Sequence, residues 1–308
     1  MSLLQQPIVA STMAVVLLMT IAVTFWLAAR QSPHSSVHDR SKSAVLITGA
    51  SRGIGKTLAE DLARLGYTVF GSVRSQSSYK AVSEQPKPEG GGKIVPVIFD
   101  VTNDAQVTEA VKTVGEALQK QGLELVCIVN NAGINPEAEV YAKIFHGEGK
   151  VPENVLGDPS IAERVFATNV IGVARVTRAF QPLLTNTNGR IVTIGSYFGT
   201  IAGGIGLSHS YYESSKFALE GFSDGLRRSL KKQGIAVSLI KPGNIDTDMN
   251  TVGESSTDVV SKDVIHAVEA KKPRHRYYPG KVKGLPVGLL CTIFALFPTW
   301  FTDILIHG

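Results

Sequence analysis

The sequence predicts an α/β protein with one doubly wound parallel β-sheet, helices on both faces of the sheet and a transmembrane helix before it. From Ser43 onward, short β-branched runs alternate with amphipathic helical patterns, as in successive βαβ units. The strand-like runs are apolar almost throughout, which is typical of strands covered on both faces. The 308 residues suffice for one large domain with terminal extensions, whereas two full domains would be a tight fit.

The N-terminal segment has no charged residue from position 8 to position 29, a stretch long enough to cross a membrane as a helix. A cleavable signal peptide is the alternative, but it normally has a shorter apolar run and basic residues before it. Arg30, Arg40 and Lys42 follow the apolar stretch, so the positive-inside tendency places the rest of the chain in the cytosol. We therefore expect a single-pass anchor at 8–29 and a polar linker at 30–42.

The folded part is predicted element by element from residue 43 to residue 282. Strands are expected at 44–48, 68–73, 93–99, 125–129, 190–195 and 235–240, and helices include 56–66, 104–122, 160–180 and 215–234. Gly66, Gly122 and Gly234 stand where three of these helices should end, because glycine readily adopts the left-handed conformation that terminates a helix.

Composition excludes several classes of protein. Cys127 and Cys291 are the two cysteines, too few for a disulfide framework or a zinc cluster, and we predict no metal site. The net charge is +5, but the basic residues are dispersed and form no block that would follow a phosphate backbone, so we expect no nucleic-acid partner. A mildly basic surface fits an anionic membrane better.

A glycine-rich turn follows the first predicted strand directly and leads into a helix. Backbone N–H groups at such a helix start can bind a pyrophosphate, which predicts a dinucleotide site of the Rossmann type. A glycine cluster alone could also be a tight strand-to-helix turn. The candidate residues in the turn are Gly49, Ser51, Arg52, Gly53, Ile54 and Gly55.

The end of the second predicted strand distinguishes NAD from NADP. An acidic residue there binds the ribose 2′-hydroxyl, whereas a basic residue accommodates a 2′-phosphate. Arg74 stands at this position and Arg52 could add a second guanidinium, so NADP(H) is the expected cofactor. The alternative is that both arginines are solvated surface residues. Asp100, after the third strand, could accept from the adenine amine or cap the helix that follows Val101.

Further motifs follow in order: NNAG at 130–133, TNVIG with Asn169, Ser196 at a strand end, Y-x-x-x-K, and PG at 242–243. With the glycine-rich turn, they make residues 43–282 resemble the short-chain dehydrogenase/reductase family. The resemblance implies a catalytic tetrad of Asn169, Ser196, Tyr212 and Lys216. It gives Asn169 a structural and proton-relay role, where the residue alone would suggest a surface position on a helix. It also implies cofactor contacts from Tyr212, Lys216, Val101, Asn131, Ala132, Gly133, Pro242, Gly243, Ile245 and Thr247.

Tyr212 and Lys216 are four residues apart and therefore share one face of a helix. A nearby ammonium favours the phenolate of tyrosine, which is otherwise a poor base at neutral pH. Tyr212 is thus predicted to exchange the proton when a carbonyl and an alcohol interconvert, with Ser196 fixing the reacting oxygen. Tyr211 competes as the phenol, but no lysine follows it at that spacing. His209 could suggest a Ser/His hydrolase, yet no G-x-S-x-G elbow precedes it, and we expect a solvated loop histidine.

Two long loops, 133–169 and 196–212, border the expected substrate site, and Ser208 and Ser210 in the second are weaker alternatives to Ser196. Residues 283–308 are too apolar for an exposed tail. They could dip into a membrane, close the substrate pocket or span the membrane a second time.

An anchor combined with such a tail resembles the membrane-anchored hydroxysteroid and retinol dehydrogenase branch. The resemblance implies a steroid, retinoid or keto-lipid substrate, the endoplasmic reticulum membrane, and a homodimer formed through the helices that carry Asn169 and Tyr212. Three alternatives stay open: an NAD-dependent alcohol dehydrogenase, a non-catalytic nucleotide-binding membrane scaffold, and a membrane-tethered interaction protein.

Overall fold

The computed structural model describes residues 36–84, 88–136, 158–184, 189–202, 207–249 and 253–297. The predicted anchor at 8–29 and the end of the C-terminal segment, 298–308, lie outside these ranges. Among the described residues, no helix combines the length and the hydropathy needed to cross a membrane.

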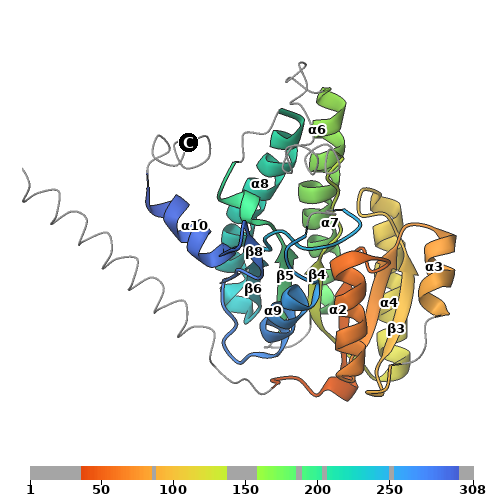
Figure 1. The fold of residues 1–308 in the computed structure, drawn as a ribbon. Helices are drawn as coiled ribbons and strands as arrows, with labels where there is room; N and C mark the ends of the chain where they lie inside the picture. The colour runs from red at the N-terminus through yellow and green to blue at the C-terminus, as the bar shows by residue number, and fades with distance from the viewer. Residues whose placement is uncertain are drawn as a thin grey trace, which may run out of the picture.

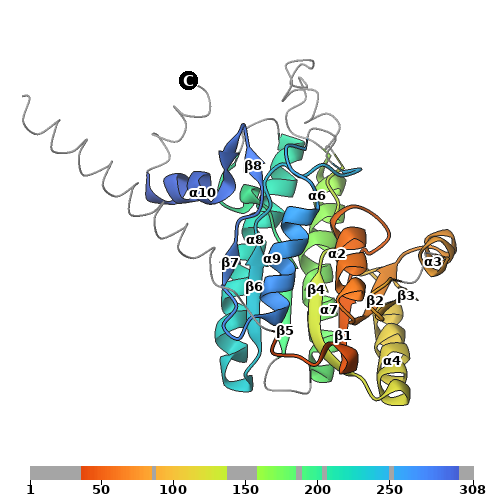
Figure 2. The same cartoon turned by 60° about the horizontal axis from the view of Figure 1, so that its bottom comes forward.

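Seven parallel strands of the described chain form one sheet (Figure 1), in the order β3-β2-β1-β4-β5-β6-β7, as the labels in Figure 2 show. The order reverses between β1 and β4, so the sheet is doubly wound as predicted, and its carboxyl edge forms a crevice at that point. The strands are β1 Ser43–Ile47, β2 Thr68–Val73, β3 Lys93–Ile98, β4 Glu124–Asn130, β5 Arg190–Ile194, β6 Ala236–Ile240 and β7 Arg276–Tyr277.

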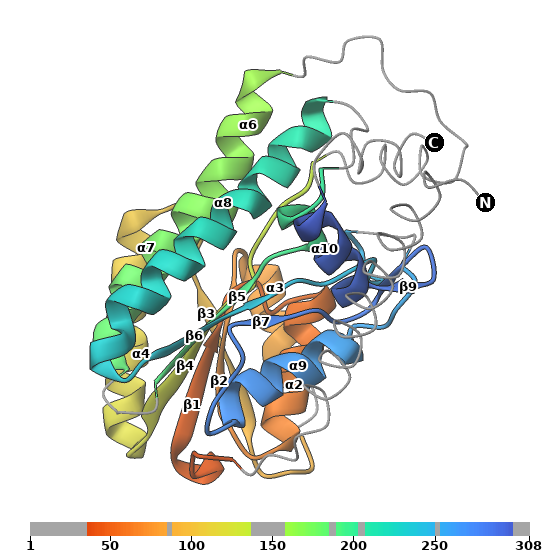
Figure 3. The same cartoon turned by 90° about the vertical axis from the view of Figure 1, so that its left-hand side faces the viewer.

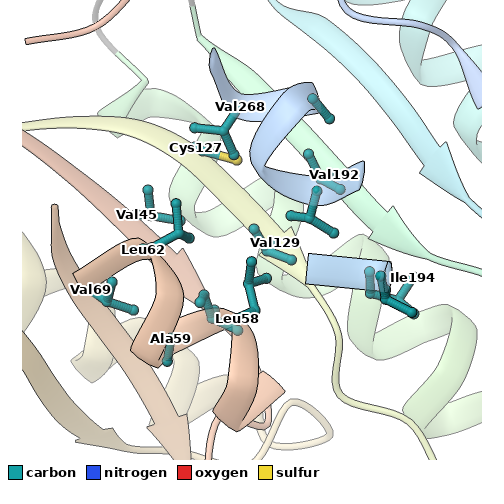
Figure 4. Packing of buried hydrophobic residues seen from close by; sticks show 14 of the residues in the cluster. Val45, Leu58, Ala59, Leu62, Val69, Cys127, Val129, Val192, Ile194 and Val268 are labelled. Carbon is teal, nitrogen blue, oxygen red and sulfur yellow. The ribbon is translucent and has the colours of Figure 1, made fainter. Parts of the chain in front are cut away.

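Helices cover both faces of the sheet, as the apolar strands require. On one face lie α2 (Gly53–Arg64) and α9 (Asp258–Glu269); on the other lie α4 (Asp104–Gln121), α7 (Gly172–Phe180) and α8 (Leu207–Leu230) (Figures 2 and 3). Residues of β1 alternate between the two layers, because Val45 and Ile47 pack with the first core and Ala44 and Leu46 with the second. Figure 4 shows the first core, in which side chains of α2 and α9 meet those of the central strands.

The remaining elements are η1 Arg40–Lys42, α3 Gln76–Ser83, α6 Pro159–Phe166, the π-helical η2 Ala167–Ile171, η3 Gln181–Leu183, η4 Tyr197–Gly199, η5 Lys231–Gln233, the hairpin strands β8 Lys281–Val282 and β9 Leu285–Pro286, and α10 Val287–Leu296. Among them, α6 and η2 run straight into α7 and pack against α8. Gly122 and Gly234 end α4 and η5 in the left-handed conformation, with φ of 62° and 72°. Gly66 also has a positive φ, just after α2, so all three predicted helix ends are confirmed.

The described end of the predicted linker, residues 36–42, is held against the domain. The Arg40 Nε atom lies 2.7 Å from Glu269 Oε1, and the Val37 backbone N–H donates to the Glu269 carbonyl at 3.0 Å. Glu269 is buried and its carboxylate also accepts from the Tyr67 hydroxyl. These contacts fix the chain to α9 immediately before β1 begins.

Candidate active site

A cavity of about 610 Å³ lies at the carboxyl edge of the sheet, where the strand order reverses. This volume is in the range of small-molecule and cofactor sites. The cavity brings together most of the predicted site residues, including Ser196, Tyr212 and Lys216 and the segments that follow β1, β2, β3, β4 and β6. Of the predicted residues, Gly55 and Asn169 do not line it.

In the glycine-rich turn between β1 and α2, backbone segments lie so close together at Gly55 that a side chain would not fit there. Gly49 and Gly53 have φ of +70° and +53°, a conformation that side chains disfavour. A Cβ atom at Gly55 would lie 2.2 Å from the Gly49 carbonyl oxygen, so Gly55 supports the turn from behind. The Asn131 side chain donates to the carbonyls of Thr48 and Gly49 at 2.9 and 3.0 Å. The turn at the start of α2 therefore fits the pyrophosphate cradle predicted from the sequence.

Two arginines line the cavity at the end nearest α3, where both are solvent-exposed. Arg52 precedes α2 and Arg74 follows β2, and the cavity lining there also includes Ser75 and Ser78. Ser75 caps α3 by accepting from the Ser78 N–H at 3.2 Å. Guanidinium groups and hydroxyls around one end of a dinucleotide cavity suit a 2′-phosphate.

Asp100 lines the cavity but does not cap the helix that follows. Its Oδ1 accepts from the Thr102 N–H and hydroxyl at 2.8 and 2.6 Å, whereas Asn103 caps α4. The capping alternative for Asp100 is therefore wrong.

Asn169 lies behind the cavity wall. It is 1% exposed, so the surface position suggested by the residue alone is wrong. Its amide exchanges two hydrogen bonds with the backbone of Ile134, at 2.8 and 2.9 Å, and donates to Ser215 Oγ at 3.1 Å. Asn169 thus ties the segment after β4 to α8, the helix that carries Tyr212.

Ser196, Tyr212 and Lys216 line the same cavity, at the end of β5 and on α8. Ser196 caps η4 by accepting from the Phe198 N–H at 3.2 Å. The Lys216 ammonium donates to the Ile194 carbonyl at 3.0 Å and lies 5.4 Å from the centre of the Tyr212 ring. Burial lowers the pKa of Lys216 to about 8. Tyr211, the competing phenol, is not among the residues that line the cavity.

His209 corrects an expectation from the sequence, because it is a buried part of the cavity wall and not a solvated loop residue. It is 3% exposed and lies one turn before Tyr212 on α8, with the two ring centres 5.7 Å apart. Its Nε2 is 3.7 Å from a Glu213 carboxylate oxygen, which would favour the imidazolium. Burial outweighs this and lowers the pKa of His209 to about 4, so the ring is neutral. The sequence offered one signal for this position. If the helix of Tyr212 begins at least three residues earlier, His209 lies one turn before Tyr212 on the same face of the helix.

The described part of the C-terminal segment packs beside the cavity wall. Val287 and Cys291 of α10 belong to the same cluster as Tyr197 and Phe198, with Tyr212 packed against it. Leu285 and Leu296, before and at the end of α10, are 47% and 66% exposed. The α10 residues Val287 and Cys291 pack against Tyr197 and Phe198, which line the cavity, but no residue of α10 lines the cavity itself. Helix α10 has ten residues, and residues 298–308, which complete the predicted C-terminal segment, lie outside the described part of the chain.

Comparisons with known proteins agree with this arrangement. The model of the short chain dehydrogenase family matches residues 43–257. Mouse estradiol 17-beta-dehydrogenase 2 is 31% identical in an alignment that covers 80% of this chain and 71% of that protein. Rat 17-beta-hydroxysteroid dehydrogenase type 6 is 34% identical, and the match covers 70% of this chain and 60% of that protein. A short chain dehydrogenase from Burkholderia cenocepacia, solved in complex with NADP, has the same fold, with a TM-score of 0.66 at 24% identity over 86% of this chain and 97% of that one.

Proposed function

Because the chain belongs to the short-chain dehydrogenase family, whose members are oxidoreductases acting on CH–OH groups, we propose that it interconverts a carbonyl and an alcohol on a lipophilic substrate with NADP(H) as the cofactor. The observation that carries the proposal is a single cavity that holds the glycine turn, two arginines and the Tyr212–Lys216 pair. Reduction of the carbonyl is the proposed physiological direction.

The residues in and behind the cavity have separate roles in the proposed reaction. A bound nicotinamide dinucleotide would supply the hydride for reduction. Tyr212 delivers a proton to the substrate oxygen, and the Ser196 hydroxyl donates a hydrogen bond to the same oxygen. The Lys216 ammonium, held by the Ile194 carbonyl at 3.0 Å, stabilises the phenolate that Tyr212 leaves behind. Asn169 keeps α8 aligned with the segment after β4 through its bonds to Ile134 and Ser215.

Arg52 and Arg74 favour NADP(H) over NAD(H) in this proposal. Both are solvent-exposed and line the cavity, and a guanidinium binds a phosphate through a charge-assisted hydrogen bond. The glycine turn would hold the pyrophosphate, which both cofactors share, so the choice between them rests on these two side chains.

A lipophilic substrate, a membrane location and a homodimer complete the proposal. The aromatic rings of Tyr197 and Phe198 line the cavity, and relatives named for estradiol and hydroxysteroids suggest a steroid, retinoid or keto lipid. The uncharged stretch at 8–29 would anchor the chain in the endoplasmic reticulum membrane with the catalytic domain in the cytosol. Exposed Ile171 and Phe217, on neighbouring helices, provide an apolar surface for a second copy.

Cofactor titration of the full chain in mild detergent tests the proposal. We expect tighter binding of NADPH than of NADH, and a loss of NADPH affinity of about tenfold or more in Arg74→Ala, the size of one charge-assisted hydrogen bond. Arg64→Ala, at the far end of α2, is the control and should bind NADPH like the wild type. Equal binding of both cofactors by the wild type would favour the NAD-dependent alternative, and binding of neither would contradict the proposal.

Turnover is then measured with NADPH and a panel of lipophilic ketones and aldehydes. Tyr212→Phe should lower kcat by about 10²- to 10⁴-fold while it still binds NADPH, because it loses only the proton donor. Tyr211→Phe is the matched control on the adjacent phenol. Equal losses in the two variants would argue against Tyr212 as the proton donor, and NADPH binding without any turnover by the wild type would favour the scaffold alternative.

A further inference from the structure

Asn244, which follows the PG turn, connects three separate segments of the chain. Its side chain is 2% exposed and lines the cavity. The amide nitrogen donates to Glu254 Oε1 at 3.1 Å, and the amide oxygen accepts from the Tyr197 hydroxyl at 3.4 Å. The backbone N–H donates to the Lys281 carbonyl at 3.0 Å. Asn244 therefore touches the cavity wall, the segment at Glu254 and the C-terminal hairpin.

Glu254 extends this connection to the turn of the β8–β9 hairpin. Its backbone N–H donates to the Asn244 carbonyl at 2.9 Å. Its carboxylate accepts from the backbone N–H groups of Lys283 and Gly284, each at 2.7 Å. Burial acts to raise the pKa of Glu254, but these donors and the Asn244 amide outweigh it and hold the pKa below its usual value. Glu254 is therefore a carboxylate at neutral pH, with hydrogen bonds to both segments.

The hydrogen bonds of Asn244 and Glu254 are linked to Ser196 through the next residue, Tyr197. Tyr197 follows Ser196 directly, and its backbone N–H donates to the Pro242 carbonyl at 3.0 Å. Its ring centre lies 4.0 Å from that of Phe198, in the cluster that α10 completes. Beside it, the PG turn is pressed against α10, because a Cβ atom at Gly243 would lie 2.4 Å from a Val287 methyl carbon. Displacement of Asn244 would therefore shift the wall that carries Ser196.

We propose that Asn244 and Glu254 are positioning residues that hold Ser196–Tyr197, the PG turn and the C-terminal hairpin with α10 as one wall of the substrate cavity. The C-terminal segment thereby contributes to substrate affinity without contacting the reacting atoms. The kinetic part of this inference rests on the proposed function, whereas the connection itself is measurable without a substrate.

Reciprocal substitution tests the pair. Asn244→Asp places a second carboxylate against Glu254, and Glu254→Gln removes the charge that accepts from the hairpin turn. The double variant restores one amide and one carboxylate at the contact between positions 244 and 254, with their places exchanged. The glutamine has a single acceptor oxygen, so one hydrogen bond from the hairpin turn stays lost and the recovery there is partial. Glu116→Gln, an exposed residue of α4 on the opposite edge of the sheet, is the control. Glu254 is itself exposed, so Glu254→Gln leaves the core untouched.

Amide hydrogen exchange of the full chain is the substrate-independent measurement. We expect Asn244→Asp to accelerate exchange both at 281–286 and at 195–199, the double variant to slow it again at 195–199 and only in part at 281–286, and Glu116→Gln to match the wild type. Acceleration in neither segment, or in the hairpin alone, would overturn the inference.

Kinetics give the second measurement. Asn244→Asp should raise KM for a lipophilic carbonyl about tenfold, which corresponds to about 1.4 kcal/mol, with smaller changes in kcat and in NADPH affinity, and the double variant should lower KM again. An unchanged KM beside accelerated exchange would overturn the positioning role. If the wild type reduces no carbonyl, the proposed function fails, and the exchange data alone decide whether the pair holds the wall together.

Discussion

Lys216 combines burial with a required positive charge. Its ammonium lies near the Tyr212 ring, where the proposed reaction needs it, but burial lowers its pKa to about 8. An ordinary lysine has a pKa near 10.4, so the folded protein holds the charge less readily than the unfolded chain does. The residue that assists the chemistry therefore costs stability at neutral pH.

The pH dependence of stability tests this statement. Between about pH 8 and pH 10.4 the unfolded chain keeps the Lys216 proton while the folded protein has lost it, so the contribution of Lys216 to stability improves as pH rises. Relative to Lys216→Met, the wild type should gain on the order of 3 kcal/mol in the free energy of unfolding from pH 7 to pH 10.5. Urea denaturation of both proteins at several pH values measures the difference. A difference that stays constant with pH would mean that Lys216 titrates normally.

Among single residues, the sequence predicted those whose role depends on a motif and missed those whose role depends on burial. Spacing alone placed Tyr212 and Lys216 on one face of α8, and both line the cavity. It could not predict the buried positions of His209 and Asn169, because a polar residue on a helix gives no local sign of what covers it. Asn244 was missed for the same reason, since its partners lie on other segments.

At the scale of elements, the turn between β1 and α2 makes the sharpest stability test. Gly55→Ala would force a Cβ atom to within 2.2 Å of the Gly49 carbonyl oxygen, and backbone cannot give way like a flexible side chain. We expect NADPH affinity to fall at least tenfold and stability to fall by about 1–3 kcal/mol, as is typical of overpacking. Gly115→Ala in α4 is the control.

A Cβ atom added at Gly115 would meet nothing within 4 Å, so an alanine there should stabilise α4 by about 0.5–1 kcal/mol and leave NADPH binding unchanged. Thermal unfolding and cofactor titration compare the two variants. Normal NADPH binding by Gly55→Ala would show that the turn can widen and that its geometry does not define the site.

Regular elements were predictable where local pattern and burial agree. The six predicted strands are all present, and five of them are apolar runs buried between two layers of helices, whereas β3, at the edge of the sheet, is only partly buried. Strand β7 was not predictable, since its two residues, Arg276–Tyr277, are fixed only by pairing with β6. The predicted helix at 160–180 contains the π-helical Ala167–Ile171, which places Asn169 against Ile134. The π-helical interruption depends on this contact with another segment. Residues 167–171 contain neither proline nor glycine, so nothing in the local sequence indicates it.

For the whole molecule, two exposed apolar residues, one on α8 and one on the neighbouring η2, test the proposed self-association. Ile171 and Phe217 are 51% and 43% exposed, and the helices that carry them pack side by side on the outside of one layer (Figure 3). We expect the full chain in detergent to be a dimer and Ile171→Arg/Phe217→Arg to be a monomer, because buried charges without partners oppose association.

Light scattering coupled to size-exclusion chromatography measures the mass, with correction for bound detergent. Ile98→Arg is the matched control, because Ile98 is 41% exposed on the opposite part of the molecule, in β3. A monomeric wild type, or a dimer that survives both arginines, would contradict the predicted interface.

The two cysteines have a practical consequence for this protein. Cys127 and Cys291 are 0% and 4% exposed, and burial raises the pKa of both thiols, so they stay protonated and shielded from alkylating reagents. Thiol-reactive labels should therefore not react with the native folded chain, and a newly introduced surface cysteine can be labelled selectively. A cysteine introduced at the exposed Leu296 could carry an environment-sensitive fluorophore, whose emission would report whether the end of α10 rests in lipid or in water while the enzyme works.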